Sequence, residues 1–385
     1  MIRIIKFNNF YSFKDQQVIN FTVNKKKSND YYESYDGTQI SKIAGFVGPN
    51  ASGKTNVMRV FGFLAFLMSS HDKKDDDFTP FKSFVFSNNE ISSLEVEFET
   101  DEHIFLYKLS LTEQFIVTES MEFKELKKGS RYTILFEREK NDIKLNIKLF
   151  PGVTKKNLSS IPDHVSVIAF INANYNIEII SEVHLYFSLL FCNINEAGYT
   201  QTINKSISTA SDLYINYPDV KERMEGIIDE FGIGIDKFIF EKDDDGLYVI
   251  TANHKVEKKN YRLPLHYESR GTQALFCEIG RILLFLNIGS ILVSDEIETG
   301  LHPEAVNKLI NFVTEELINK KKQFIFSSHS LDFMKKFDAQ QIFLVEKEEN
   351  VSELFRLDEL RLRSEENYYK KYQSGAYGAF PKIRI

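Results

Sequence analysis

The sequence predicts an α/β fold built on a mostly parallel sheet, with an antiparallel β region and a helical segment inserted into it. Four apolar runs of strand length alternate with stretches of helical spacing, which is typical of parallel α/β sheets. Residues 93–149 alternate polar and apolar side chains in short runs, which predicts antiparallel hairpins with one wet face. Residues 177–231 are mainly helical by pattern. The four apolar runs are 42–47, 290–295, 323–327 and 341–346.

These patterns divide the 385 residues into three segments. We expect residues 1–175 to hold the first half of the α/β domain with the antiparallel region. Residues 176–235 are the predicted helical insertion, and residues 236–385 the second half of the domain. Hydrophobic residues make up 43% and charged residues 27% of the chain, which is ordinary for a globular protein and excludes a disordered one.

Charge and composition restrict the partners and the compartment. The net charge of −7 predicts no bulk attraction to nucleic acid, although a local basic face is compatible with it. Cys192 and Cys277 lie in apolar runs, so we expect buried free thiols in a reducing compartment. The apolar stretch 279–293 contains Arg281, which predicts a buried helix followed by a strand and no membrane span. We therefore expect a cytoplasmic protein.

Shorter segments carry further secondary-structure signals. Residues 165–171 form an apolar run that predicts a strand. Residues 237–251 predict a hairpin that turns at the Asp-Asp-Asp-Gly sequence of 243–246. Strands are also predicted at 2–7 and 17–23, and helices at 56–68, 274–286, 303–319 and 331–337.

A strand, a glycine-rich loop and a helix follow one another at 42–68, which is the order that a phosphate-binding loop requires. The loop fits G-x-x-x-x-G-K-[ST], and its two glycines let backbone N–H groups wrap the phosphates. Lys54 places a cation on the β- and γ-phosphates, and Thr55 offers its hydroxyl to Mg²⁺. The predicted cofactors are therefore ATP and Mg²⁺. The predicted nucleotide-binding residues are Gly48, Pro49, Asn50, Ala51, Ser52, Gly53, Lys54, Thr55 and Asn56.

Two other strand ends carry side chains suited to hydrolysis. The strand at 290–295 ends in two carboxylates, of which Asp295 is predicted to hold Mg²⁺ and Glu296 to orient or deprotonate the attacking water. His329 follows the strand at 323–327 and is predicted to donate to the γ-phosphate. The alternative is a capping context, in which Ser330 caps a helix at 331–337. The predicted catalytic residues are Lys54, Glu296 and His329, and the predicted metal ligands are Thr55 and Asp295.

The sequence Glu268-Ser-Arg-Gly-Thr-Gln opens the helical run at 274–286. A serine and a glycine at a helix N-terminus form a second anion site. Because the chain already has one phosphate-binding loop, Ser269, Gly271 and Thr272 are predicted to serve the γ-phosphate of a partner subunit. The alternative is an ordinary capped helix, with Ser269 or Thr272 as the cap.

Together these motifs resemble the ABC/SMC/RecF class of ATPases. In that class a signature helix lies shortly before the acidic strand, and Ser269 precedes Asp295 by 26 positions. The opening Phe7-Asn-Asn-Phe-Tyr-Ser-Phe is similar to the start of RecF-like proteins. The resemblance implies an ABC-type P-loop domain that hydrolyses ATP as a homodimer or a higher assembly of dimers. It also implies that Asn50 positions water or phosphates, and that Glu298–His302 lies at the dimer seam.

A narrower resemblance concerns phage defence. Asp295-Glu-Ile-Glu-Thr-Gly-Leu-His-Pro resembles a segment of stand-alone bacterial defence ATPases, among them AbiL-type abortive-infection ATPases, the AriA subunit of PARIS systems and the ATPase part of OLD nucleases. The ending Tyr372–Pro381 is similar to the tail of members encoded beside a small RloB-like or Toprim-like effector. This resemblance implies a sensor or scaffold that controls a separate effector, such as a nuclease, in abortive infection.

Some features depart from these families and leave alternatives open. Arg270 stands where an ABC signature has its first glycine, and no Q-loop glutamine can be placed, although 84–89 is where it would lie. One alternative is a RecF/SMC-like DNA-binding ATPase in DNA repair, for which short lysine clusters are the candidate contacts. Another is a nucleotide-binding interaction module with slow turnover. The lysine clusters begin at Lys25, Lys127, Lys155, Lys258 and Lys320.

Overall fold

The chain folds into two compact units in the computed structural model. Unit 1 comprises Met1–Tyr199, Ser290–Glu296 and Leu317–Ile385, and unit 2 comprises Thr200–Gly289 and Ile297–Glu316. The structure describes residues 1–24, 28–69, 81–86, 91–194, 203–242, 248–257, 259–360 and 368–374.

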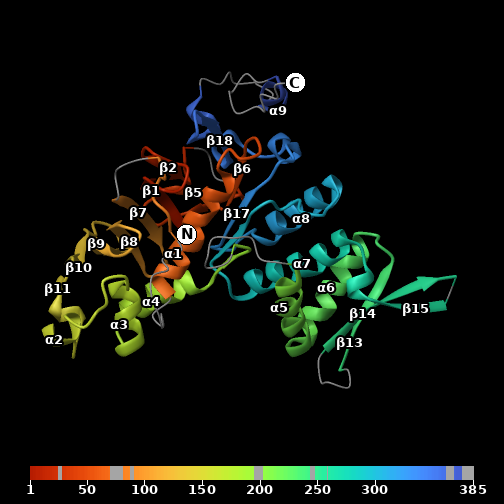
Figure 1. Ribbon diagram of the computed structural model, residues 1–385, viewed down its shortest axis with the longest axis horizontal. Coiled ribbons are helices and arrows are strands. Elements are labelled where there is room, and N and C mark those ends of the chain that lie inside the picture. Colours follow the sequence, from red (N-terminus) through yellow and green to blue (C-terminus); the bar gives the residue numbers. More distant parts are fainter. Residues whose placement is uncertain are drawn as a thin grey trace. The chain divides into compact units, whose positions relative to one another are not determined.

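The central sheet of unit 1 is parallel except for its last strand; Figure 1 labels its strands β17, β6 and β18. Its order is β12-β16-β17-β6-β18-β19. Strands β16, β17 and β6 are buried along their whole length, which explains why their sequences are continuous apolar runs. The predicted α/β class with a mostly parallel sheet is confirmed. The strands are β6 Ile43–Val47, β12 Leu190–Cys192, β16 Ile291–Ser294, β17 Gln323–Ser327, β18 Ile342–Glu348 and β19 Val351–Arg356.

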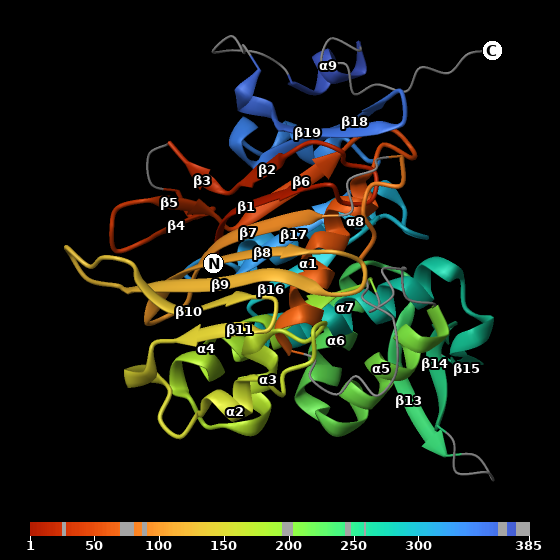
Figure 2. The same ribbon diagram turned by 60° about the vertical axis from the view of Figure 1, so that its left-hand side comes forward.

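A seven-stranded antiparallel sheet forms the second layer of unit 1, in the order β11-β10-β9-β8-β7-β1-β2 (Figure 2). Its strands alternate buried and partly exposed side chains, as the period-two pattern predicts. Helix α1 (Lys54–Ser69) shares one hydrophobic core with both sheets. The strands are β1 Ile2–Asn8, β2 Gln17–Asn20, β7 Ser92–Glu99, β8 His103–Leu111, β9 Ile116–Glu125, β10 Thr133–Glu139 and β11 Asp142–Leu145.

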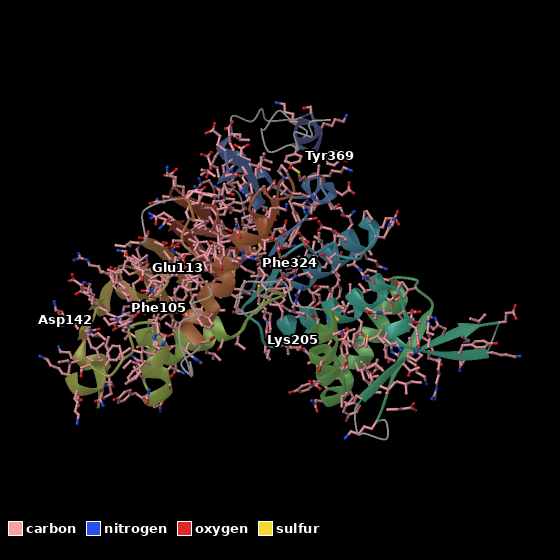
Figure 3. All side chains as sticks on the ribbon, viewed as in Figure 1. Phe105, Glu113, Asp142, Lys205, Phe324 and Tyr369 are labelled. Atoms are coloured by element: carbon pink, nitrogen blue, oxygen red, sulfur yellow. The ribbon has the colours of Figure 1, made fainter. Side chains whose placement is uncertain are left out.

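Figure 3 contrasts the interior and the surface of unit 1. Phe105 of β8 and Phe324 of β17 are fully buried, whereas Asp142 projects from the β10–β11 hairpin. Unit 1 also contains a small antiparallel sheet and four further helices, of which α3 and α4 pack against α1. These elements are the sheet of β3 Thr22–Val23, β5 Gln39–Ser41 and β4 Tyr31–Glu33, and the helices α2 Lys155–Leu158, α3 Val167–Asn174, α4 Glu178–Ser188 and α9 Tyr368–Gln373.

The boundaries of the units differ from those of the three predicted segments. The predicted helical insertion, 176–235, is shared between the units. Its first part belongs to unit 1, because α4 packs against α1 and β12 pairs in parallel with β16. Its second part belongs to unit 2, which also contains 297–316 from beyond the acidic strand.

Unit 2 consists of helices and a three-stranded antiparallel sheet, β13-β14-β15, whose strand β13 packs against α6. Phe276 of α7 packs its ring against Tyr214 at 4.9 Å and Phe238 at 5.0 Å between centroids. The predicted hairpin at 237–251 is confirmed, although its turn, 243–247, lies outside the described residues. The elements are α5 Ile203–Asn216, α6 Pro218–Glu230, β13 Ile235–Lys242, β14 Tyr248–Val256, β15 Lys259–Pro264, α7 Arg270–Ile288 and α8 Pro303–Glu316.

Helix α7 is, among the described residues, the helix that by length and composition could cross a membrane. The helix ends at Ile288 and is followed by β16, as the sequence predicts. About 61% of its most apolar window is buried inside the protein, so packing accounts for its apolar side chains. Cys277 on this helix and Cys192 on β12 are free thiols, and both are partly exposed where full burial was expected. Burial still raises the pKa of Cys277 to about 12.

The strand predicted at 165–171 is wrong, because these residues begin helix α3. Ser166 caps the helix, and its Oγ accepts hydrogen bonds from the N–H groups of Ile168 and Ala169 at 3.1 and 3.2 Å. The Glu119 carboxylate accepts a third, from the N–H of Val167, at 3.0 Å. A short apolar run does not distinguish a buried strand from a buried helix, and here the cap decides.

The helix predicted at 331–337 is also wrong, because the segment forms only a 3₁₀ turn at Asp332–Lys335. Ser330 does not cap it; the residue before the turn is Leu331, which makes no side-chain capping bond. Aromatic packing holds the turn instead. Phe333 packs edge-on against Phe326, with ring centroids 4.9 Å apart, and lies against the bare Cα of Gly45.

Candidate nucleotide-binding and hydrolysis site

The glycine-rich loop connects β6 to α1, at the carboxyl end of the central parallel sheet. A Cβ at Gly48 would clash with the Val345 carbonyl oxygen and lie 2.7 Å from Ser52 Oγ. Gly53 has a φ of +115°, and a Cβ there would lie 2.7 Å from Ser352 Oγ. Both positions therefore require glycine, which leaves the loop backbone free to approach an anion.

Lys54 opens α1, and its side chain folds back over the loop. The residue is only 5% exposed. Its Nζ donates to the carbonyl oxygens of Gly48 at 2.9 Å and Pro49 at 3.0 Å. The cation is thus held at the loop where β- and γ-phosphates would sit, at the positive end of a 16-residue helix.

The two carboxylates after β16 have opposite environments. Asp295 is 2% exposed, and its Oδ1 accepts a hydrogen bond from Ser327 Oγ at 2.6 Å. The Asn193 side chain accepts from the Asp295 N–H at 2.8 Å and donates to its carbonyl at 2.7 Å. The Glu296 side chain is 51% exposed, and the residue has a φ of +48°. The fixed carboxylate suits a metal-binding role, and the outward one suits contact with water.

His329 follows β17 and faces both groups. Its Nδ1 lies 3.5 Å from Lys54 Nζ, and its Nε2 lies 3.9 Å from Glu296 Oε1. The structure therefore brings the three residues predicted as catalytic together at the ends of two parallel strands and one helix. The capping alternative for this segment is not realised, because Ser330 caps no helix.

A cavity of about 540 Å³ lies at this place, entirely within unit 1. It is lined by the loop from Asn50 to Asn56, with Glu296 and His329. The glycine cradle fits a phosphate chain. The hydroxyl of Thr55 and the carboxylate of Asp295 are the oxygen ligands that Mg²⁺ prefers, with phosphates and water to complete its shell. The residues present therefore fit Mg-ATP, whose metal would supply charge neutralisation at the phosphates.

Sequence reasoning missed the serines that support the loop from behind. The Ser352 hydroxyl of β19 donates to the Ser52 carbonyl at 2.6 Å, and its Oγ lies within hydrogen-bond distance of Ser12 Oγ, at 2.8 Å. Ser12 Oγ in turn accepts from Asn56 Nδ2 at 2.7 Å. We call Ser12, Ser352 and Asn56 the loop clamp. The RecF-like opening motif included Ser12, but nothing in the local sequence marked Ser352.

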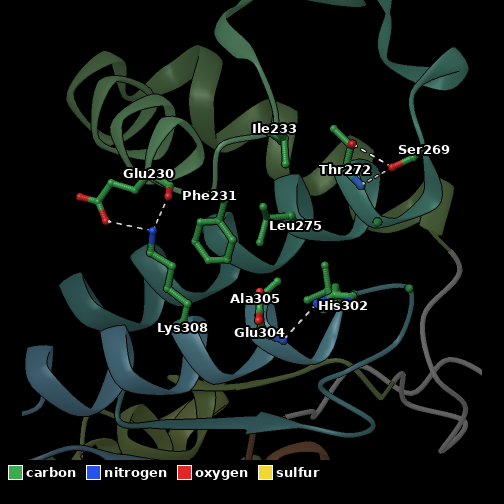
Figure 4. A pocket seen from close by; sticks show the side chains of 13 residues that line it. Glu230, Phe231, Ile233, Ser269, Thr272, Leu275, His302, Glu304, Ala305 and Lys308 are labelled. Atoms are coloured by element: carbon green, nitrogen blue, oxygen red, sulfur yellow. Dashed lines mark hydrogen bonds and ion pairs between the residues drawn. The ribbon is translucent and has the colours of Figure 1, made fainter.

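The signature residues lie in unit 2, not at this cavity. Ser269 is the N-cap of α7, and its Oγ accepts from the Thr272 N–H at 3.1 Å and lies 2.9 Å from Thr272 Oγ1 (Figure 4). A Cβ at Gly271 would lie 2.6 Å from the Gly300 carbonyl oxygen, so the loop of 297–302 passes close to the helix N-terminus. Both stretches line a second cavity of about 430 Å³, within unit 2.

Two predicted features fall partly outside the described residues. The segment 84–89, where the Q-loop would lie, is described to Phe86, and the Phe84 N–H donates to Asn9 Oδ1 at 3.1 Å. The ending Tyr372–Pro381 is described only to Ser374.

Comparison with known proteins places this geometry in a family. Residues 43–335 match the family model described as "AAA domain, putative AbiEii toxin, Type IV TA system". The chain belongs to this AbiEii-type AAA family. None of the curated proteins matches the chain. The family and the site together identify an ATPase.

The fold of this AbiEii-type ATPase is that of SMC heads. An SmcHead bound to the C-terminal winged-helix domain of ScpA matches with a TM-score of 0.51 and 15% identity, over 93% of this chain and 98% of that one. The SMC head domain from Thermotoga maritima matches with a TM-score of 0.43 and 15% identity, over 92% and 98%. An Smc head bound to the C-terminal domain of ScpA derived from Pyrococcus furiosus matches with a TM-score of 0.46 and 14% identity, over 93% and 97%. The ABC-type nucleotide-binding fold predicted from the motifs is confirmed.

We predict that Lys54→Ala abolishes ATP binding, because it removes the cation that is held over the glycine cradle. The affinity for Mg-ATP, measured by isothermal titration calorimetry, should fall by about 100-fold or more. Lys155→Ala, which removes an exposed lysine from α2, is the matched control and should bind normally. Normal ATP binding by Lys54→Ala would show that this loop is not the ATP-binding site.

We predict that Ser352→Ala loosens the loop clamp without removing any group that faces the cavity. Loss of two hydrogen bonds of about 1 kcal/mol each should raise the KM for ATP by about 3- to 30-fold and leave kcat within about twofold. Ser159→Ala, at an exposed serine, is the control. An unchanged KM would show that the loop holds its shape without Ser352.

Proposed function

We propose that this ATPase is an ATP-switched homodimer that controls a separate effector protein in anti-phage abortive infection. The observation that carries the proposal is the division of the motifs between units. Unit 1 holds the phosphate-binding loop, Glu296 and His329, and unit 2 holds the signature serine with its own cavity. A capped helix N-terminus beside a cavity, in a unit without the phosphate-binding loop, suits the nucleotide of a second copy.

The energetics of such a switch follow from mass action. ATP held between two copies stabilises the closed dimer by its contacts with both. Hydrolysis removes the γ-phosphate and with it the contacts that hold the signature residues, so the dimer opens. Glu296 orients or deprotonates the attacking water, and Lys54 and His329 stabilise charge on the γ-phosphate. The ATPase cycle then sets how long the closed form lasts.

The defence role rests on the family and on the sequence motifs. The family description names the AbiEii toxin and a type IV toxin–antitoxin system. The solved SMC head that shares this fold is bound to a domain of a second protein, ScpA. By analogy, the closed dimer would hold a cytoplasmic effector, such as a Toprim-like or RloB-like nuclease, and release or activate it upon infection.

Dimer closure can be tested with two substitutions. Glu296→Gln should retain ATP without hydrolysing it and shift the chain from monomer to dimer in analytical ultracentrifugation with Mg-ATP. Adding Ser269→Arg should return it to monomer, because the larger cation fills the anion site of the signature. Ser208→Arg, at an exposed serine of α5, is the matched control and should leave the dimer intact. A dimer that survives Ser269→Arg would refute the trans role of the signature.

The effector can be tested by purification from the native locus with neighbouring genes intact and Mg-ATP present. We expect a stoichiometric protein encoded nearby that remains bound to Glu296→Gln and leaves the wild type when ATP is hydrolysed. Lys54→Ala, which cannot bind ATP, should not retain it. A homodimer that carries no such protein in any of the three forms would contradict control of an effector.

A further inference from the structure

The β14–β15 hairpin of unit 2 is a basic region on an acidic chain. Residues 253–267 contain four cationic side chains and one carboxylate, a net charge of +3, whereas the whole chain carries −7. Strand β15 is exposed at five of its six residues. Arg262 pairs with Glu241 at 3.3 Å, but both side chains are 59% exposed, so water screens this pair. Among the described residues, the cations Lys255, Lys259 and Arg262 are all exposed to solvent.

Aromatic and aliphatic side chains accompany these charges. Tyr261 is 54%, Val256 52% and Tyr267 70% exposed. In the strand register Val256 lies opposite Lys259, and Tyr261 lies opposite His254. Opposed residues of an antiparallel pair share a face, so Lys259, Tyr261 and Val256 lie together on one side of the hairpin. We call these three residues the hairpin face; the exposed Tyr267 follows β15, in the 3₁₀ turn Leu265–Tyr267.

The need to keep the open edge of β15 from pairing with another strand does not account for the side chains of the hairpin face. Among the described residues β15 pairs only with β14, so its other edge is open. Lysines alone are enough to keep an open edge from pairing with another strand. Exposed tyrosine and valine side chains work against such protection, because they add apolar surface that a partner can cover. The hairpin face thus has the composition of a contact surface.

The hairpin is also joined to the signature helix. His254 Nε2 on β14 lies 2.5 Å from Glu268 Oε1. Glu268 immediately precedes the N-cap Ser269, and its carbonyl accepts from Gln273 Nε2 at 2.9 Å. A ligand that moves β14 therefore acts on the residue that precedes the signature serine.

We propose that the hairpin face binds single-stranded nucleic acid, with Tyr261 stacking on a base and Lys259 contacting phosphates, while Arg262, on the other face of β15, attracts the strand through its charge. Cations interleaved with exposed aromatic rings on an open sheet are the combination that single strands require, because every base has a face on which a ring can stack. This assignment does not depend on the identity of the effector.

The test is fluorescence anisotropy with fluorescein-labelled 30-nucleotide single strands of DNA and RNA, and the matching duplex, at several salt concentrations. The wild type should bind the single strands, with affinity that falls as salt rises. The double substitution Lys259→Glu and Arg262→Glu should reduce binding and lower the salt slope by about 1 to 2. Tyr261→Ala should weaken binding by about 5- to 100-fold and leave the slope unchanged.

Control variants distinguish binding at the hairpin face from general attraction to positive charge on the protein. The double substitution Lys155→Glu and Lys156→Glu changes charge equally on α2 of unit 1 and should bind as the wild type does. Circular dichroism and basal ATP hydrolysis should be unchanged in the hairpin variants, which excludes misfolding. No binding to any probe, or binding that Lys259→Glu with Arg262→Glu leaves intact, would overturn the proposal. Equal competition by polyglutamate, with no effect of Tyr261→Ala, would assign the hairpin to an acidic protein instead.

Discussion

The clamp on the phosphate-binding loop is the constraint on which the rest of the site depends. Gly53 approaches Ser352 and Ser12 so closely that no side chain fits between them. The hydroxyl of Ser352 holds the loop backbone at Ser52 and also holds Ser12, which binds Asn56 of α1. A strand from near the chain's end and a loop from its start thereby fix the loop before any phosphate arrives, which lowers the ordering cost of binding.

The ends of two parallel strands place the acidic residues and the histidine of the site beside the loop. Asp295 and Glu296 follow β16, and His329 follows β17, which pairs with β6 beneath the loop. The Ser327 hydroxyl donates to the Asp295 carboxylate and accepts from the Glu296 N–H, so one buried side chain fixes the first carboxylate and the backbone of the second residue. Two adjacent acids thus share one supporting residue but differ in environment, because Asp295 is buried and the Glu296 side chain is exposed.

Much of this could be predicted from the sequence, because the decisive signals were local. The buried strands β6, β16 and β17 are continuous apolar runs, and the glycine-rich loop has a defined spacing. The wrong predictions concern features that a local sequence pattern does not determine. The apolar run at 165–171 suits a strand or a helix, and the cap at Ser166 decides between them. Strand β12 is short, and it is a strand only because it pairs in parallel with β16.

The support of the site could not be predicted for a similar reason. Ser12 and Ser352 are 340 positions apart in the chain, and neither belongs to a pattern that marks a partner so distant. The same holds for the close approach of Gly271 to Gly300, which accounts for one glycine of the signature while Arg270 stands at the other position. Long-range contacts of this kind come from the tertiary fold, and propensity carries no information on them.

In the proposed homodimer, one hydrolysis site requires two copies of the chain. The most direct test is the specific ATPase activity measured across a 1000-fold range of protein concentration at saturating Mg-ATP. If two copies complete each site, specific activity should rise with concentration and reach a plateau where the dimer is fully formed. A specific activity that stays constant down to concentrations at which only monomer is present would contradict the claim.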